Sequence, residues 1–434
     1  MSRLLITEAK KIGTGVVTVS GWVRNLRVHK GVIFVDLCDI SGTMQIVFLS
    51  GDDNYKLAEG LSLESVIEVS GVLQERPAKK TEVNPVKDYE LGVKTAKLIS
   101  LADSNLPIPV LQKGDSEVNL DNRLDWRWLD LRREENQLIF KVWTKLEEGF
   151  RDYFSANNFI QIYTPCLMNT ASETGSEVFE VKYFERKAYL SQSPQFYKQM
   201  AIASGLEKVF MVGPVFRAEL SFTTRHVSEF TGWDFELSFI DSHAALMDIE
   251  EDLLISGFKK VKEQLGLDLE IPAKPFPKIT LAEAKIKLQA AGIKSEKDFD
   301  FSTEEEKELG EIIKKEFGHD FVFVTDYPIA ARPFYHMRHS DQPNLTKSFD
   351  LLYRGLEITT GAQREHRVDI LERQALEKNM NLEELKDYLN FFRYGCPSHG
   401  GVGIGPGRII MKMLNLNSIK EACFLPRDVK RLTP

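Results

Sequence analysis

Between residues 15 and 100, short runs of β-branched and aromatic residues alternate with glycine, aspartate and proline. The runs are GVVTVSGWVRNLRV, GVIFVDLCDISGTMQIVFL, SVIEVSGVLQERPA and YELGVKTAKLISLA. The pattern predicts short strands that close into a small β-barrel. Such barrels often bind single-stranded nucleic acid, because bases stack on exposed rings while cations follow the phosphates. Phe34 and Phe48 are candidate stacking residues, and the alternative is that both belong to the barrel core.

A helical period follows the proline-containing stretch SNLPIPVLQKGDSEVNLDNR. The apolar positions that repeat every fourth residue are Leu138, Val142, Leu146, Phe150 and Phe154. They predict an amphipathic helix that ends near Asn157–Asn158 and opens a second domain near residue 130. Strand signals return at about 163–240, residues 241–320 are helical and rich in Lys and Glu, and strands resume at 321–434.

Composition and charge narrow the class of protein. The 434 residues carry 56 Lys and Arg against 64 Asp and Glu, a net charge of −8. This balance excludes a protein that holds nucleic acid through overall positive charge and leaves a local RNA surface open. No apolar run approaches the about 18 residues of a membrane helix, so we expect a cytoplasmic protein with no membrane partner. The four cysteines lack CxxC spacing, so we expect neither a disulfide framework nor a zinc site.

The segment GPVFRAELSFTTRHVSEFTGWDFELSFI concentrates charge between two strand-like runs. Arg217, Glu219, Arg225, His226 and Glu229 fall within thirteen positions. A strand–loop–strand with forked cations suits a polyphosphate, because guanidinium pairs bidentately with phosphate oxygens. The alternative is a solvated charged hairpin loop, which composition alone favours.

A second segment, FDLLYRGLEITTGAQREHR, contains two carboxylates that could share one magnesium ion. Asp350 and Glu357 lie seven positions apart on strand-like sequence. An odd spacing puts them on opposite faces of a regular strand, so a bulge or a turn at Arg354–Gly355 would be needed. Taken alone, this pair is ambiguous.

A third segment, HGGVGIGPGRII, is rich in glycine and precedes a predicted helix with Arg408 near its start. Glycines let the backbone approach a ligand closely. Such a run is weak evidence by itself, and no βαβ unit surrounds it, which excludes a dinucleotide fingerprint.

The order of these segments resembles the class II aminoacyl-tRNA synthetases over nearly the whole chain. The first motif corresponds to YFSANNFIQIYTPCL with Pro165, the second to FRAE followed by RH, and the third to the glycine-rich sequence ending in Arg408. LDWRWLDLRR, YLSQSPQFYKQ, FRYGCPSHGG and FLPRDVKRLTP are similar to aspartyl-tRNA synthetases of the archaeal and eukaryotic type.

The resemblance implies an α+β protein with two domains. An OB-fold β-barrel that binds the anticodon is expected at 1–103 and a hinge at 104–130. The class II catalytic domain, an antiparallel sheet flanked by helices, is expected at 131–434 with a helical insertion at about 245–320. A homodimer built on the helix and strand of the first motif is also implied.

The resemblance further implies ATP as a substrate and Mg²⁺ as a cofactor. The catalytic arginines would be Arg217 on the α-phosphate and Arg408. The implied ATP-binding residues are Arg217, Glu219, Arg225, His226, Phe230, Glu357 and Arg408. Phe230 would stack on adenine, Glu219 would contact the adenine amino group or the tRNA end, and Asp350 and Glu357 would be the magnesium carboxylates.

L-Aspartate is the implied amino acid. The matching pocket residues are Glu173, Ser193, Gln195, Lys198, Asp234 and Arg364. Lys198 and Arg364 place two cations where the substrate side-chain carboxylate would sit, and asparagine would leave them unpaired. Lys198 is therefore the main reason to expect aspartate.

On the barrel, the resemblance assigns five residues to the anticodon of tRNA(Asp). Phe34 and Gln45 match residues that stack on and read the middle base, and Glu90 matches a reader of the third. Arg24 and Arg27 would contact backbone phosphate. Whether tRNA(Asn) is a second substrate is left open by the sequence.

Two departures from the family pattern keep alternatives open. Gly407 stands where an acidic residue usually precedes the arginine, so Arg408 is expected to be less constrained, and the alternative is that an acidic group from another segment fills the role. Leu220, Ser221 and Phe222 make the second-motif loop more apolar than usual. The alternatives are an asparaginyl-tRNA synthetase and a paralogue that binds tRNA without charging it. A bare RNA-binding barrel would leave most of the chain unexplained.

Overall fold

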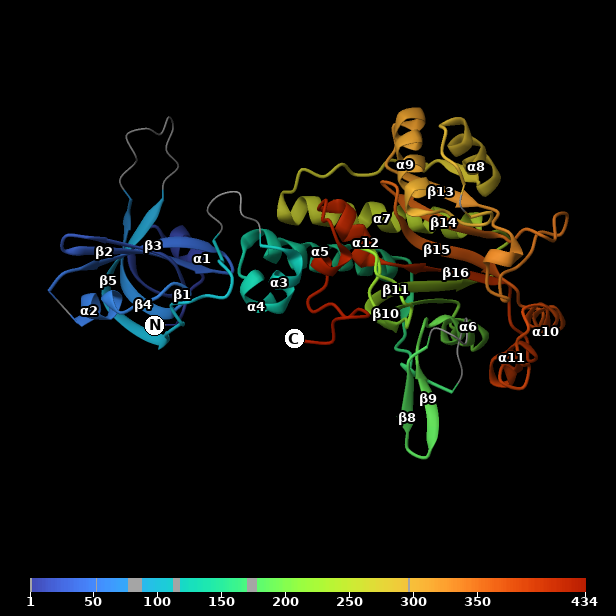
Figure 1. The fold of residues 1–434 in the computed structure, drawn as a ribbon, viewed down its shortest axis with the longest axis horizontal. Coiled ribbons are helices and arrows are strands. Elements are labelled where there is room, and N and C mark those ends of the chain that lie inside the picture. The colour runs from blue at the N-terminus through green and yellow to red at the C-terminus, as the bar shows by residue number, and fades with distance from the viewer. Residues whose placement is uncertain (1, 52, 77–87, 112–117, 170–177, 296) are drawn as a thin grey trace. The chain divides into compact units, whose positions relative to one another are not determined.

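The computed structural model describes residues 2–51, 53–76, 88–111, 118–169, 178–295 and 297–434. The chain divides into two compact units, residues 1–133 and 134–434 (Figure 1). Among the described residues, no helix is long and apolar enough to cross a membrane.

The first unit is a closed five-stranded barrel with the strand order β1-β2-β3-β5-β4. Its elements are α1 (Ile6–Ile12), β1 (Gly15–His29), β2 (Val32–Asp39), β3 (Gly42–Leu49), α2 (Asp53–Glu59), β4 (Val66–Glu75), β5 (Tyr89–Ser100), α3 (Leu120–Asp125) and α4 (Arg127–Asp130). Alternating apolar residues such as Val35 and Ile46 are fully buried inside the barrel, as a half-buried strand requires. Phe48 also belongs to this core, whereas Phe34 is only half-buried.

Residues 104–130, the segment expected as a hinge, belong to the first unit. Helix α4 is anchored there by Asp130, which is fully buried. Its carboxylate accepts hydrogen bonds from Arg127 at 2.6 Å and from Arg123 at 2.9 Å. A buried carboxylate with two cationic donors is well compensated, so the segment is ordered where described.

The second unit is built on an eight-stranded sheet with the order β12-β13-β14-β15-β16-β11-β10-β6. Its strands are β6 (Ile160–Gln161), β10 (Lys208–Phe216), β11 (Glu229–Ser238), β12 (Lys278–Thr280), β13 (Phe321–Thr325), β14 (Ser348–Tyr353), β15 (Glu357–Arg364) and β16 (His399–Ile404). Only the outer pairs β12·β13 and β10·β6 are parallel. The predicted α+β class, a barrel followed by a largely antiparallel sheet with helices, is confirmed.

The remaining elements surround this sheet. They are α5 (Glu134–Ala156), β7 (Leu167–Met168), β8 (Glu180–Tyr183), β9 (Arg186–Leu190), α6 (Gln195–Ala203), α7 (Ala244–Leu265), α8 (Leu281–Ala290), α9 (Thr303–Phe317), a 3₁₀ turn (Ile329–Ala331), α10 (Val368–Glu377), α11 (Lys386–Phe392), α12 (Pro406–Met413) and α13 (Ile419–Ala422). Strands β7, β9 and β8 form a separate small sheet.

Helix α5 confirms the periodicity of the sequence. Val142, Leu146 and Phe150 are at most 2% exposed, and they pack in the main core together with residues of α7 and the sheet. The apolar stripe is thus covered within its own unit. This corrects the expectation that the stripe forms the exposed face of a dimer.

The expected insertion at about 245–320 combines two structurally different parts. Leu253, Leu254 and Phe258 of α7 belong to the main core, so α7 is part of the catalytic unit itself. Only β12, α8 and α9 form a separate hydrophobic cluster with β13, and in Figure 1 these two helices stand beside β13 and β14. An amphipathic helix has the same sequence pattern whether it covers a central sheet or an appended module, so the sequence did not distinguish these two parts.

Candidate active site

A cavity of about 1470 Å³ opens beside β11, β15 and β16. Most of the residues singled out in the sequence line it, although they come from segments far apart in the chain. These residues are Ser193, Gln195, Arg217, Glu219, Arg225, His226, Phe230, Asp234, Glu357, Arg364 and Arg408. Lys198 and Asp350 are buried and do not line the cavity. Glu173 lies outside the described residues.

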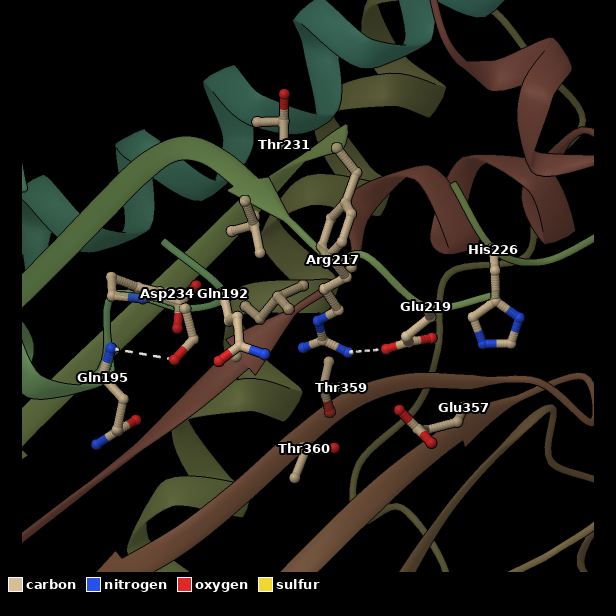
Figure 2. A pocket seen from close by; sticks show the side chains of 18 of the residues that line it. Gln192, Gln195, Arg217, Glu219, His226, Thr231, Asp234, Glu357, Thr359 and Thr360 are labelled. Carbon is tan, nitrogen blue, oxygen red and sulfur yellow. Dashed lines mark hydrogen bonds and ion pairs between the residues drawn. The ribbon is translucent and has the colours of Figure 1, made fainter. Parts of the chain in front are cut away.

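The hairpin of β10 and β11 carries the residues at the centre of the cavity. The two strands pair as far as Phe216 and Glu229, and the Arg217 N–H still donates to the Ser228 carbonyl at 2.9 Å. Figure 2 shows Arg217 between Asp234 and Gln195 on one side and Glu219, His226 and Glu357 on the other. Its side chain is 41% exposed and lies 3.8 Å from a Glu219 oxygen. The guanidinium is therefore only loosely held and open to a ligand.

One end of the cavity is lined by three basic residues, Arg225, His226 and Arg408. Burial, with the nearby charges of Arg408 and Arg225, lowers the pKa of His226 to about 4. His226 is therefore neutral at pH 7. Burial is the largest cause of this shift, and the two arginines that add to it provide positive charge that favours a polyanion.

Arg408 is more constrained than the sequence predicted. Its Nη1 donates to the Glu357 carbonyl at 2.9 Å and to the Glu357 carboxylate at 3.2 Å. An acidic residue from β15 thus orients the arginine. The expectation that Gly407 leaves Arg408 without an orienting group is wrong, because the carboxylate comes from a distant segment.

The strands that hold Asp350 and Glu357 are irregular, as their odd spacing required. A register shift occurs between Leu351 and Leu352 where β14 pairs with β15. Arg354 and Gly355 form the connecting turn with φ of 48° and 66°. Both carboxylates are consequently turned toward one region of the sheet, and each affects the other electrostatically.

These two carboxylates differ in their suitability for a metal ion. Asp350 is 4% exposed, and it accepts a hydrogen bond from Arg332 at 2.7 Å. Glu357 lines the cavity with a side chain that is 34% exposed. Among the described residues, no cluster of three or more His, Cys, Asp or Glu could hold a metal. Because Mg²⁺ in nucleotide sites often takes one or two carboxylates plus phosphate oxygens, Glu357 fits such a site. Asp350 is paired with Arg332 through Oδ2, while its Oδ1 is buried without a hydrogen-bond partner among the described residues.

A buried charge cluster lies at the other end of the cavity. Lys198 Nζ lies 2.7 Å from Asp234 Oδ2 and 3.3 Å from Glu236 Oε2. Arg364 Nε donates to Glu236 Oε1 at 3.1 Å. Although burial alone would raise it, Arg364 and Lys198 hold the pKa of Glu236 below its ordinary value. Burial raises the pKa of Asp234, and Lys198 offsets only part of this effect.

The contacts in this cluster show that Lys198 and Arg364 are not two unpaired cations, as the motif residues alone suggested. Lys198 is 1% exposed and lies behind Asp234, and two carboxylates already balance Lys198 and Arg364. Arg364 reaches the cavity wall, where it also donates to His336 Nε2 at 2.8 Å and to the Gly401 carbonyl at 3.0 Å. A guanidinium has five N–H donors, so two remain for a ligand.

Two residues of the QSPQFYK segment, Ser193 and Gln195, line the same end of the cavity as this charge cluster. The Gln195 backbone N–H lies 3.4 Å from Ser193 Oγ at the start of α6 (Figure 2). The Gln195 side-chain nitrogen is buried and has no hydrogen-bond partner among the described residues. An unsatisfied donor on a cavity wall is costly unless a ligand or water accepts from it.

On the barrel, three of the expected anticodon residues form a connected polar row. Gln45 donates to Glu90 at 2.7 Å across the β3·β5 pair, and Arg27 donates to Gln45 at 3.1 Å. The half-buried ring of Phe34 makes an edge contact with His29, with centroids 5.9 Å apart. Arg24 is different, because its side chain is 7% exposed and is ion-paired with Glu64. Arg24 therefore stabilises the unit and is not available to a phosphate.

The sequence analysis missed Glu236, Arg332 and Glu306. Glu236 follows Asp234 by two residues on β11, so strand periodicity could have placed both on one face. Arg332 contacts Asp350, and Glu306 of α9 forms an ion pair with Arg225 at 2.7 Å. Neither contact has a local sequence signal, because the partners come from distant segments.

Comparison with known proteins agrees with this architecture. Residues 119–429 match the family model of the class II tRNA synthetases (D, K and N), and residues 17–99 match the OB-fold nucleic acid binding domain. The chain is 40% identical to the "Aspartate--tRNA(Asp/Asn) ligase" of Aeropyrum pernix, over 99% of this chain and 98% of that protein. It is also 40% identical to the "Aspartate--tRNA(Asp) ligase" of Pyrococcus abyssi, over 96% of each.

A solved structure is similar to this chain over its full length. The asparaginyl-tRNA synthetase from Pyrococcus horikoshii, complexed with asparaginyl-adenylate, superposes with a TM-score of 0.90 at 29% identity and covers 100% of both chains. A family match over both units, together with a cavity that gathers residues of the second and third motifs and of the QSPQFYK segment, confirms the predicted resemblance. The chain belongs to the class II tRNA synthetases of the D, K and N group.

Proposed function

We propose that this protein is an aspartate–tRNA ligase, which activates L-aspartate with ATP and transfers it to the 3′ end of tRNA(Asp). The position of Arg217 carries the proposal. It lines one cavity with Asp234 and Arg364, which suit an amino acid, and with Arg225 and Arg408, which suit phosphates. Figure 2 shows Arg217 between Asp234 and His226. The names of the relatives from Aeropyrum pernix and Pyrococcus abyssi support aspartate as the substrate.

In this proposal, the reaction depends on placement more than on acid–base groups. Asp234 and Gln195 would receive the substrate ammonium and backbone, and Arg364 would receive the side-chain carboxylate. The substrate α-carboxylate then attacks the α-phosphorus of ATP in line and expels pyrophosphate. Arg217 and Arg408 would stabilise the charge that develops on the phosphoryl oxygens. The aspartyl adenylate passes its acyl group to the terminal ribose of tRNA.

Glu357 is the residue proposed to hold Mg²⁺ together with ATP phosphates, with Asp350 behind it. Bound Mg²⁺ would neutralise phosphate charge. Glu357 also accepts from Arg408, so it would position that arginine against the same phosphates. Phe230 is the proposed stacking surface for adenine, with Glu219 near its amino group.

The barrel is proposed to bind the anticodon through Phe34, Gln45 and Glu90. The hydrogen bonds along Arg27, Gln45 and Glu90 hold these polar groups in a fixed order, which favours reading of base edges. Arg27 is 42% exposed at its side chain and is the proposed phosphate contact. The proposed place of action is the cytoplasm, where tRNA is charged.

Asparagine activation is the second candidate function. The cation pair of Lys198 and Arg364 is already balanced by Asp234 and Glu236, so a neutral side chain would leave no net excess charge. The likeness to the asparaginyl-tRNA synthetase of Pyrococcus horikoshii also favours it. Greater sequence identity to the aspartate ligases places this candidate second.

Pyrophosphate exchange tests the proposal. With ATP and Mg²⁺ we expect aspartate to support exchange, with kcat/KM about a hundredfold or more above that of asparagine, because the remaining Arg364 N–H donors would face an amide NH₂ group in place of a second carboxylate oxygen. Equal values for the two amino acids would contradict the aspartate assignment. Exchange with asparagine alone would establish the second candidate, and exchange with neither would indicate a paralogue that does not charge tRNA.

Aminoacylation of purified tRNA(Asp) and tRNA(Asn) then decides how many tRNAs are served. The relative from Aeropyrum pernix is named for both tRNAs and that from Pyrococcus abyssi for one. If this protein aspartylates both tRNAs, its specificity is like that in the name of the Aeropyrum pernix relative.

A homodimer is proposed on the segment that leads to Pro165. This segment exposes Ile160 by 48%, Tyr163 by 83% and Leu167 by 45%. Strand β6 is the last strand of the eight-stranded sheet, so its outer edge is open to pairing among the described residues. An apolar edge of this kind is typical of a surface that is covered in a two-fold assembly.

Sedimentation at micromolar concentration should show a species of twice 49.5 kDa. Tyr163→Glu should shift it toward the monomer, because a charge would be placed among apolar groups of the interface. Tyr394→Glu is the matched control, since Tyr394 is 88% exposed on a different segment. A wild-type monomer, or equal effects of the two substitutions, would refute this interface.

A further inference from the structure

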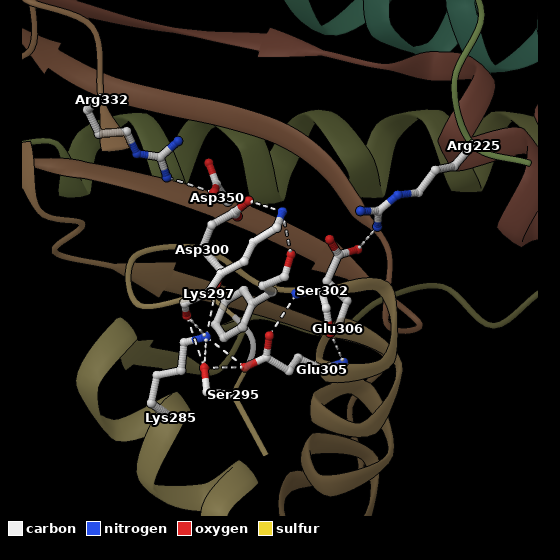
Figure 3. Close-up of polar contacts among 11 residues, drawn as sticks. Arg225, Lys285, Ser295, Lys297, Asp300, Ser302, Glu305, Glu306, Arg332 and Asp350 are labelled. Carbon is white, nitrogen blue, oxygen red and sulfur yellow. Dashed lines mark hydrogen bonds and ion pairs between the residues drawn. The ribbon is translucent and has the colours of Figure 1, made fainter. Parts of the chain in front are cut away.

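The module formed by β12, α8 and α9 carries no recognised sequence motif. It nevertheless reaches the end of the cavity with Arg225 and Arg408, the residues proposed to bind phosphates. Glu306, in the first turn of α9, is 4% exposed. Its Oε2 lies 2.7 Å from Arg225 Nη1 and accepts the Glu357 backbone N–H at 3.2 Å. Figure 3 shows the Arg225–Glu306 contact between the hairpin loop and α9. One carboxylate oxygen therefore joins two segments that line the cavity.

The contact leaves most of Arg225 available. Nη1 is paired with Glu306, and Arg225 Nε has no hydrogen-bond partner among the described residues although it is buried. A guanidinium held at one nitrogen keeps its other donors in a fixed direction. Glu357, held through its backbone by the same oxygen, in turn orients Arg408.

A close glycine contact fixes α9 at this distance. A Cβ on Gly310 would lie 2.5 Å from the Gly355 nitrogen, and a Cβ on Gly355 would lie 2.7 Å from Lys307 Cα. The helix thus rests directly on the turn that precedes Glu357. Only glycine permits this approach, and Gly355 also has a φ of 66°. The position of Glu306 relative to Glu357 is consequently defined by backbone packing.

We propose that Glu306 is a positioning residue for ATP, through which the β12–α9 module holds Arg225 and Glu357 ready for the phosphates. The inference rests on the proposed ATP-dependent function. In the free protein the ion pair keeps the flexible Arg225 side chain in one place, so binding ATP costs less conformational entropy. The module is then part of the nucleotide site and not only an appended structural unit.

Glu306→Ala should raise both the Kd of ATP, measured by calorimetry without amino acid, and the KM of ATP in exchange by tenfold or more. The KM of aspartate should change by less than twofold, because Glu306 contacts neither Asp234 nor Arg364. Glu306→Gln should recover much of the loss, since its amide oxygen can still accept from Arg225 and the Glu357 N–H. Gly310→Ala keeps every charge but displaces α9, and it should raise the Kd of ATP in the same direction.

Glu305→Ala is the matched control. Glu305 accepts from Lys285 at 2.7 Å and from the Ser302 backbone at 2.7 Å, so its loss should weaken the module without touching the cavity. We expect a lower Tm and an unchanged Kd for ATP. Wild-type ATP affinity in Glu306→Ala, or equal losses in Glu305→Ala and Glu306→Ala, would overturn the inference. Failure of the wild type to exchange pyrophosphate would refute the proposed function alone, because ATP binding still measures the role of Glu306.

Discussion

Replacing Lys198 by leucine is expected to lower kcat/KM for aspartate in pyrophosphate exchange by at least about a hundredfold, with ATP affinity changed by less than about twofold. The substitution leaves Asp234 and Glu236 buried with Arg364 as the remaining close cation. Breaking a buried ion pair costs roughly 3–5 kcal/mol, which corresponds to two to four orders of magnitude. The incoming substrate carboxylate would then meet an excess of negative charge.

A double substitution separates the two contributions of Lys198. Lys198→Leu with Glu236→Gln removes one charge of each sign, so we expect the Tm to recover toward the wild-type value. Exchange with aspartate should stay low, because Asp234, which lines the cavity, has still lost its ammonium partner. Recovery of exchange in the double variant would show that Lys198 serves only to neutralise Glu236. Near-wild-type kinetics in Lys198→Leu alone would show that the substrate carboxylate is held elsewhere.

The main elements could be predicted because their signals are local. Runs of β-branched and aromatic residues separated by Gly, Asp and Pro predicted the barrel strands. The four-residue repeat from Leu138 to Phe154 predicted α5, which the structure places at Glu134–Ala156. This repeat follows directly from which face of the helix is buried. The irregularity between Asp350 and Glu357 was also predictable, since the spacing of seven demanded a bulge or turn.

The partners of the charged residues could not be predicted in the same way. Arg225 and Glu306, or Arg332 and Asp350, meet through tertiary packing and have no shared period in the sequence. When tertiary packing brings an opposite charge to a motif residue, the ligand that this residue is expected to bind can change. Asp350 was expected to hold a metal ion and also accepts from Arg332, and Arg24 was expected on a phosphate but is buried with Glu64.

The charge balance around Lys198 shows why partners from distant segments matter for the choice between aspartate and asparagine. Motif residues alone suggested two free cations, whereas Asp234 and Glu236 compensate them in the structure. Selection of aspartate must therefore come from the geometry of the remaining donors and from the response of the cluster to a further carboxylate. Net charge alone does not decide between aspartate and asparagine here.

Arg217→Ala is expected to lower kcat for exchange by about a hundredfold to a thousandfold, with smaller changes in the KM of ATP and aspartate. Arg217 is 41% exposed and its nearest carboxylate oxygen, from Glu219, is 3.8 Å away, so the guanidinium contributes little to folding. Its effect should appear when charge develops on the α-phosphoryl oxygens, which is a property of the transition state.

Two further variants define this role of Arg217. Arg217→Lys keeps the charge but loses the fork of donors, so its kcat should lie between those of the wild type and Arg217→Ala. Arg186→Ala is the matched control. Arg186 lies over an aromatic ring, 5.9 Å from the Tyr183 centroid, and does not line the cavity. Its kinetics should match the wild type. If Arg217→Ala instead raised only the KM of ATP, Arg217 would bind ground-state phosphate and the transition-state charge would have to be stabilised by Arg408.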